Sequence, residues 1–165
     1  METIKKILFV CTGNTCRSPM AEYLFRDLIK KNDEFELKEW EVCSAGISAV
    51  KGAEVNEKAK SVMKEIKIDI TDHSSRNIDE VELNQVDLII TMTRKHSRAL
   101  ILKYPGLADK ISTLKELSQF ESNSKDIQDP FGLSEEVYRN TRDEIEANLK
   151  KLLKKMKNIP LIEED

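Results

Sequence analysis

The sequence of 165 residues lacks any long apolar run, and no stretch approaches the roughly 20 apolar residues that a membrane-spanning helix needs. The N-terminus also lacks a signal-type cleavage site after its short apolar stretch, which predicts a cytoplasmic protein. No linker rich in Pro, Gly or Ser divides the chain, which has only 4 prolines and 5 glycines. A single domain covering residues 1–165 is therefore expected, with a frayed tail from about residue 158.

The composition also lacks a dominant charge. Lys and Arg total 27 against 30 Asp and Glu, so the net charge of −3 gives no general reason to expect nucleic acid or an anionic membrane as partner. Cysteine is scarce, and three residues without framework spacing fit a reducing compartment in which a thiol can act as a reagent. Cys11 and Cys16 are wrongly spaced for a zinc knuckle and no second Cys/His pair accompanies them, so no metal site is predicted.

The apolar pattern alternates between strands and helices. Short apolar runs predict strands over residues 6–10, 40–44, 86–92 and 110–114. Helical spacing predicts helices over residues 19–31, 55–66, 94–103 and from 134 onward. The first helix should have Ser18 as its N-cap and Pro19 at its first position, where the fixed φ and missing N–H of proline cost little.

This alternation predicts the fold class. Apolar strands that are each followed by a helix imply a parallel sheet covered on both faces, because right-handed crossovers place helices there. We expect an α/β fold: a single-domain, doubly wound sheet of four parallel strands with helices on both faces. Ligands of such sheets bind beyond the carboxyl ends of the strands, and Cys11 directly follows the first predicted strand.

What the sequence does contain is a nucleophile in a phosphate-binding loop. Residues 11–19 read Cys-Thr-Gly-Asn-Thr-Cys-Arg-Ser-Pro. The five residues between Cys11 and Arg17 suit a loop that curls around a tetrahedral anion, with the sulfur below it and the guanidinium closing one side. Backbone N–H groups, the N-terminus of the next helix and the Arg17 charge favour the thiolate, as they favour a phosphate dianion.

Individual loop residues have distinct expected roles. Gly13 lets the backbone approach the anion or adopt positive φ, and Asn14 tolerates the left-handed conformation. Arg17 can bind two phosphoryl oxygens in its planar fork. Ser18 can donate a hydrogen bond to the Cys11 sulfur and so help the thiolate leave. The predicted phosphate-binding set is Thr12, Gly13, Asn14, Thr15, Cys16 and Ser18.

The stretch Val10–Glu22 resembles the phosphate-binding loop of the low-molecular-weight protein tyrosine phosphatases, and Asp129-Pro130 resembles their general-acid loop. The resemblance extends from residue 5 to about 155. It implies a hydrolase with a phosphocysteine intermediate and no cofactor: Cys11 is the nucleophile, Arg17 binds phosphate, and Asp129 protonates the leaving group and then activates water. It also implies a supporting hydrogen-bond network of Asn14, Ser18, Ser44 and His73.

Two departures from the commoner family pattern concern the substrate. Thr15 stands where tyrosine-specific members usually carry a larger aliphatic residue, and Phe131-Gly132 stands where they have an aromatic pair. Both features resemble the protein arginine phosphatase branch instead. A slim phosphoguanidino group gains from a hydroxyl and a carboxylate, whereas phosphotyrosine gains from flanking aromatics, of which only Phe131 remains. The sequence favours phosphoarginine in proteins as substrate, with phosphotyrosine as the alternative.

Further hypotheses arise from the same residues. Arsenate reductases use a related loop, but their chemistry needs additional cysteines late in the chain and none follows Cys43. A phosphate sensor without turnover could dispense with Cys11 or Asp129, yet both are present. Cys16 could form a reversible disulfide with Cys11 that prevents over-oxidation, with plain packing as the alternative.

The remaining candidates are interpreted as structural. Tyr138 is expected to pack in the core or on the surface rather than to form a substrate wall. His96, beside Arg94, Lys95 and Arg98, is assigned to a solvated helix face rather than to a basic rim that attracts phosphoproteins. Phosphorylated proteins are the expected partners and inorganic phosphate the product, without nucleic acid or membrane. The oligomeric state and the physiological target are left open.

Overall fold

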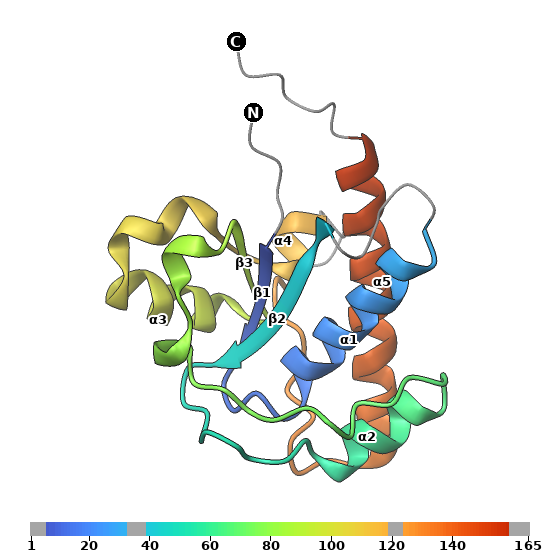
Figure 1. Ribbon diagram of the computed structural model, residues 1–165. Helices are drawn as coiled ribbons and strands as arrows, with labels where there is room; N and C mark the ends of the chain where they lie inside the picture. The colour runs from blue at the N-terminus through green and yellow to red at the C-terminus, as the bar shows by residue number, and fades with distance from the viewer. Residues whose placement is uncertain (1–5, 33–38, 119–123, 159–165) are drawn as a thin grey trace.

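The computed structural model describes residues 6–32, 39–118 and 124–158, and nearly all of the tail expected to fray lies outside these ranges. Its four strands form one sheet in the order β2-β1-β3-β4 (Figure 1). The three neighbouring pairs all run parallel. Their bounds are β1 (Lys6–Cys11), β2 (Glu41–Gly46), β3 (Leu88–Thr91) and β4 (Ile111–Thr113). The predicted doubly wound α/β fold is confirmed.

Helices and short 3-10 segments connect the strands. The α-helices of the described residues are α1 (Arg17–Lys30), α2 (Glu57–Lys64), α3 (Arg94–Lys103), α4 (Leu114–Ser118) and α5 (Glu135–Asn158). The 3-10 segments are η2 (Ile78–Glu80), η3 (Leu83–Gln85) and η4 (Pro105–Lys110). None of the helices in these ranges is long and apolar enough to cross a bilayer.

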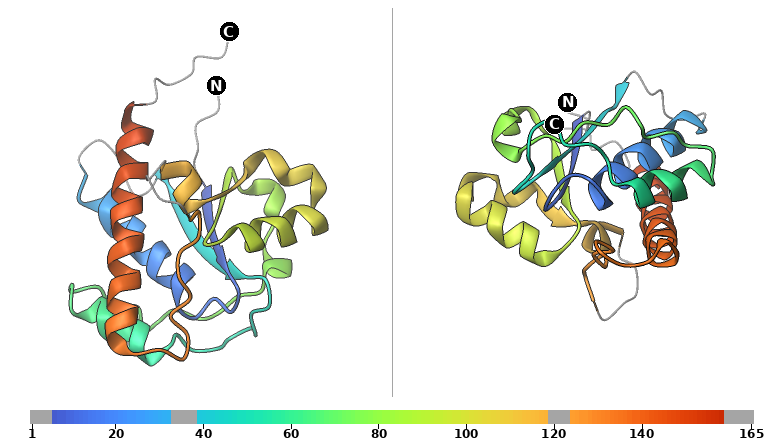
Figure 2. Two further views of the ribbon diagram at one scale, coloured as in Figure 1. Left: turned by 180° about the vertical axis from the view of Figure 1, so that it is seen from behind. Right: turned by 90° about the horizontal axis from the view of Figure 1, so that it is seen from below.

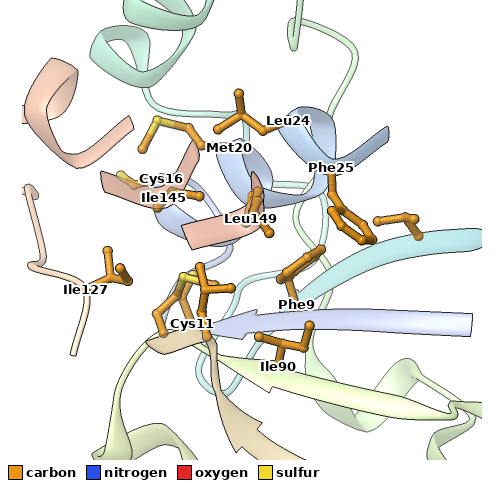
Figure 3. Packing of buried hydrophobic residues seen from close by; sticks show 14 of the residues in the cluster. Phe9, Cys11, Cys16, Met20, Leu24, Phe25, Ile90, Ile127, Ile145 and Leu149 are labelled. Carbon is orange, nitrogen blue, oxygen red and sulfur yellow. The ribbon is translucent and has the colours of Figure 1, made fainter. Parts of the chain in front are cut away.

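The two faces of the sheet carry different helices. Side chains alternate along β1, so Ile7 and Phe9 join the core formed with α1, α2 and α5, while Leu8 and Val10 join the core formed with α3, η2 and η3. Figures 1 and 2 show α1, α2 and α5 on one side of the sheet and α3 on the other. In the first core, the rings of Phe9 and Phe25 meet edge to face with centroids 5.9 Å apart (Figure 3).

Helix α1 begins earlier than predicted. Arg17 is its first residue, and Cys16 occupies the N-cap position without a side-chain capping bond, so the assignment of Ser18 as N-cap was wrong. The backbone N–H of Met20 donates to the Cys16 carbonyl at 3.2 Å. Ser18 therefore lies inside the first turn, fully buried, and its hydroxyl binds elsewhere than at the helix terminus.

The strand order reverses at β1, because the chain passes to β2 on one side and later to β3 on the other. Such a switch point opens a crevice at the carboxyl ends of the strands. Cys11, the last residue of β1, pairs with Gly46, the last residue of β2. A Cβ on Gly46 would lie 2.5 Å from the Thr12 carbonyl oxygen and 2.9 Å from the Asn14 nitrogen. The absence of a side chain at Gly46 therefore lets the loop after β1 lie directly against β2.

Candidate active site

The loop between β1 and α1 surrounds the sulfur of Cys11, whose side chain is buried. Two groups from this loop and the following turn contact the sulfur. The backbone N–H of Asn14 donates to it at 3.3 Å, and Ser18 Oγ lies 2.9 Å away. Hydrogen-bond donors at these positions stabilise a negative sulfur.

Asn14 holds the loop in the left-handed backbone region, with φ of 56°. Its side-chain nitrogen donates to Ser18 Oγ at 2.8 Å and to Ser44 Oγ at 2.9 Å. Its side-chain oxygen accepts from the backbone N–H of Arg76 at 2.9 Å. Asn14 is completely buried, and each polar group of its side chain is paired. Hydrogen bonds with Ser44 on β2 and with Arg76 before η2 therefore fix the conformation of the loop.

The hydrogen bonds diverge from the side-chain nitrogen of Asn14 along two branches, one to Ser44 and one to Ser18. Ser44 Oγ donates to a carboxylate oxygen of Glu22, since an ionised carboxylate can only accept. Ser44 and Ser18 both accept from the Asn14 amide. The Ser18 hydroxyl thus keeps its own proton for Cys11 Sγ. The network presents an O–H donor to the sulfur.

Glu22, which the sequence analysis missed, lies at the other end of this network. Its buried carboxylate pairs with Arg26 one helical turn away, and His73 Nδ1 lies 3.9 Å from it. His73 Nε2 lies 2.9 Å from the carbonyl oxygen of Asn14, and Ser75 Oγ donates to the same oxygen at 2.8 Å. The position of Glu22 four residues after the loop serine was a usable signal, because helical residues at this spacing share a face.

Arg17 connects the phosphate loop to the loop that carries Asp129. Its Nη1 donates to the Ile127 carbonyl at 2.9 Å, and its Nη2 lies 3.7 Å from Asp129 Oδ2. The backbone N–H of Ile127 donates to the Met92 carbonyl just beyond β3, at 2.8 Å. The Asp129 side chain is 58% exposed, and its Oδ1 accepts from the Phe131 N–H at 3.1 Å. The acid loop is thus anchored while its carboxylate stays accessible.

These side chains line a single open cleft with a volume of about 260 Å³. Its lining residues come from the two loops: Cys11, Thr12, Gly13, Thr15, Cys16, Arg17, Asp129 and Phe131. The predicted nucleophile, guanidinium and acid therefore meet in one place. The supporting residues Asn14, Ser18, Ser44 and His73 are brought to the same loop but lie behind the cleft lining. A cleft with a thiol at Cys11, a guanidinium at Arg17 and a carboxyl at Asp129 offers the groups that nucleophilic and acid–base chemistry on a bound anion requires.

Comparison with known proteins agrees with this geometry. Residues 6–159 match the family described as low molecular weight phosphotyrosine protein phosphatase. The chain belongs to this family. It is a cysteine-dependent protein phosphatase, and phosphorylated proteins are its substrates.

Two kinds of phosphatase are found among its relatives. The chain is 40% identical to a protein-arginine-phosphatase of Geobacillus stearothermophilus, over 92% of this chain and 95% of the relative. The structure of the YwlE arginine phosphatase from the same organism has a TM-score of 0.82 and 37% identity, covering 98% of both chains. A low molecular weight protein tyrosine phosphatase from T. tengcongensis has a TM-score of 0.82 and 41% identity, covering 92% of this chain and 99% of its own.

His96 of this phosphatase was wrongly assigned to a solvated helix face. Its side chain is only 7% exposed, and its Nε2 lies 2.9 Å from Thr12 Oγ1. Helical rotation explains the error, because His96 and Leu100 are four residues apart and both lie on the buried face of α3. Burial lowers the pKa of His96 to about 4, and the nearby Arg17 charge acts in the same direction. The ring is therefore neutral at pH 7.

Cys16 lies in the same loop as the nucleophile but in a different environment. Its sulfur contacts the hydroxyl of Tyr138 at 3.4 Å, and burial raises the pKa of the Cys16 thiol. Tyr138 is completely buried on α5, which confirms its predicted packing role. Cys11, Cys16 and Cys43 are all free thiols. In the described ranges, no group of three or more His, Cys, Asp or Glu residues could hold a metal ion.

The buried neutral ring of His96 should make stability depend on pH. The pKa of His96 is about 4 in the folded protein against an ordinary 6.5, so only the unfolded chain gains a proton between these values. Its contribution is present above pH 6.5 and is lost as pH falls toward 4. The loss is at most about 3.5 kcal/mol, from the difference between 6.5 and about 4 at about 1.4 kcal/mol per pKa unit.

Denaturant unfolding at pH 7 and pH 4.5 measures this effect. The His96→Gln variant should lose less stability between the two pH values than the wild type, because glutamine does not titrate. Equal losses in both proteins would show that His96 does not contribute to the pH dependence.

Proposed function

We propose that this phosphatase removes the phosphoryl group from phosphoarginine residues in proteins. The observation that carries the proposal is the lining of the cleft, where the Thr15 hydroxyl and the Asp129 carboxylate accompany Phe131, the aromatic residue of that lining. A guanidino group offers N–H donors that a hydroxyl and a carboxylate accept, whereas the phosphotyrosine ring gains from several aromatic walls. The name of the Geobacillus stearothermophilus relative supports the same substrate.

The proposed reaction has two displacements at phosphorus. Cys11 Sγ attacks while Arg17 binds phosphoryl oxygens, and the P–N bond breaks as the P–S bond forms. Asp129 gives its proton to the leaving guanidino nitrogen. Asp129 then takes a proton from water, whose oxygen attacks phosphorus and breaks the P–S bond. The Ser18 hydroxyl stabilises the departing thiolate, and inorganic phosphate is released.

Substitution of the nucleophile and of the acid tests these roles. Cys11→Ser should abolish turnover of a phosphopeptide yet still bind inorganic phosphate, because the loop amides and Arg17 remain. Asp129→Asn should lower kcat by about 10²–10⁴-fold, the usual contribution of a positioned acid, with a much smaller effect on phosphate affinity. Steady-state kinetics and calorimetric phosphate titration measure both. A wild-type protein that binds phosphate without turning over any phosphopeptide would instead be the sensor considered above.

Substrate preference can be measured on matched peptides that carry phosphoarginine or phosphotyrosine. The wild type should have the higher kcat/KM on phosphoarginine. Thr15→Ile should shift the ratio toward phosphotyrosine by about 10–200-fold, as one pocket group is worth about 1–3 kcal/mol. Thr15→Ser, which keeps the hydroxyl, should shift it much less. A wild-type preference for phosphotyrosine would overturn the proposal and favour the activity named for the T. tengcongensis relative.

We further propose that Cys16 makes oxidation of the nucleophile reversible. Cys11 and Cys16 line the same cleft. Donors from Asn14 and Ser18 face the Cys11 sulfur, whereas burial raises the pKa of the Cys16 thiol, so peroxide reacts first at Cys11. Peroxide converts the Cys11 thiolate to sulfenic acid; attack by Cys16 sulfur then releases water and forms a disulfide. A dithiol reduces this disulfide and restores both thiols. The cytoplasm keeps thiols reduced and can supply this reduction, so we propose it as the location of the protein.

Recovery after peroxide distinguishes this role from packing. The wild type should lose activity and regain most of it with dithiothreitol. Cys16→Ser should lose activity similarly but recover much less, because sulfenic acid proceeds to irreversible states. Cys43→Ser is the matched control, since Cys43 lies on β2 and does not line the cleft. Equal recovery in the wild type and Cys16→Ser would rule out the role.

A further inference from the structure

His96 contacts the phosphate loop without lining the cleft. Its Nε2 lies 2.9 Å from Thr12 Oγ1, and Thr12 directly follows the nucleophile and lines the cleft. The other ring nitrogen, Nδ1, is buried and has no hydrogen-bond partner among the described residues. An unpaired buried nitrogen costs free energy, which an aliphatic side chain at this position would avoid. Of the two ring nitrogens, only Nε2 therefore has a hydrogen-bond partner among the described residues, and that partner is Thr12.

The turn of α3 that carries His96 is held by other residues. Thr93 Oγ1 accepts from the backbone N–H of His96 at 3.1 Å and caps the helix. Asp126 Oδ1 accepts from the backbone N–H of Arg94 at 2.9 Å, which ties the acid loop to the same turn. On the opposite side of the loop, the Thr12 carbonyl accepts from the Ser48 N–H at 2.9 Å. Thr12 is thus held between the segment after β2 and the ring on α3.

The groups around His96 favour a neutral ring. Arg17 on α1 and Lys95 on α3 oppose a positive charge, while Asp126 and Asp129 on the acid loop favour one, and desolvation outweighs both carboxylates. A neutral imidazole carries one N–H group, and a buried N–H without an acceptor costs more than a buried lone pair without a donor. The tautomer with its proton on Nε2, where Thr12 Oγ1 can accept it, is therefore favoured over the one with its proton on the unpaired Nδ1.

We propose that His96 is a positioning residue of the phosphatase reaction: its Nε2–H donates to Thr12 Oγ1 and holds the loop beside Cys11 in the geometry that binds the phosphoryl group. The proposal rests on the proposed role of this loop as the phosphate site. His96 acts through Thr12 and does not touch the substrate.

The decisive experiment is a double-mutant cycle on Thr12 and His96. His96→Leu and Thr12→Val should each raise the inhibition constant of inorganic phosphate and the KM about 10-fold, as expected for one hydrogen bond, with a smaller change in kcat. The variant with both changes should be no worse than either single variant. His96→Gln, whose amide can still donate, should recover most of the affinity.

Ser97→Ala is the matched control for lost stability. Ser97 is a buried residue of the same turn whose hydroxyl bonds Thr91 Oγ1 at 2.7 Å, away from the phosphate loop. This variant should lower Tm and leave KM and the phosphate inhibition constant unchanged. Additive effects of His96→Leu and Thr12→Val, or an equal loss of affinity in Ser97→Ala, would overturn the proposal. A wild-type protein without turnover would instead contradict the proposed function, whatever the variants do.

Nitrogen-15 spectra of the imidazole rings provide a measurement that does not require the leucine variant to fold. The chain has two histidines, so the spectrum of His96→Gln assigns the remaining signals to His73. His96 should be neutral at pH 7 with its proton on Nε2. A charged ring, or a proton on Nδ1, would contradict the proposal.

Discussion

The arrangement of the site depends on the side chain of one buried residue, Asn14. Its left-handed backbone turns the chain back over the end of β1, and its amide binds both Ser18 and Ser44. Because the Asn14 amide nitrogen donates to both serines, each serine hydroxyl keeps its own proton to donate onward. Ser44 donates this proton to the Glu22 carboxylate. The Ser18 hydroxyl faces the sulfur of Cys11. The environment of the nucleophile is thus determined by a network buried behind the cleft.

The position of the acid relative to the nucleophile depends on contacts with Arg17 and with β3. Arg17 extends one guanidinium nitrogen to the Ile127 carbonyl and another toward Asp129, so the residue predicted to bind phosphate also contacts the acid loop. The same loop hydrogen-bonds the backbone at Met92, just beyond β3. The acid loop lies between α4 and α5 and does not continue a strand, so its hydrogen bond to Met92 is what holds it at the carboxyl end of β3, beside β1. Contacts with Met92 and Arg17 therefore bring it next to the loop after β1.

Periodicity was sufficient to predict the strands, helix α3 and the parallel sheet, because burial of alternate or helically spaced side chains is a local property of sequence. It was insufficient at α1, where Ser18 resembles an N-cap but its hydroxyl binds the loop instead. At His96 the charge pattern misled instead, because the neighbouring basic residues suggested a solvated face although the helical spacing to Leu100 favours burial. In both cases the hydrogen-bond partner lies on another element: Cys11 on β1 for Ser18, and Thr12 in the loop after β1 for His96.

By itself the sequence was enough to predict the candidate reacting groups. Cys11 and Arg17 belong to one short loop, so their spacing alone indicates a thiolate facing a bound anion, and Asp129-Pro130 marks a second loop suited to an acid. Only the tertiary structure decided what surrounds these groups: the carboxylate of Glu22 behind Ser44, the ring of His96 against Thr12, and the hydroxyl of Tyr138 beside Cys16. The physical reason is that a hydrogen bond requires two atoms within about 3 Å of each other. An error of one residue in the rotation of a helix moves a side chain by more than this distance, so the sequence pattern alone does not identify such partners.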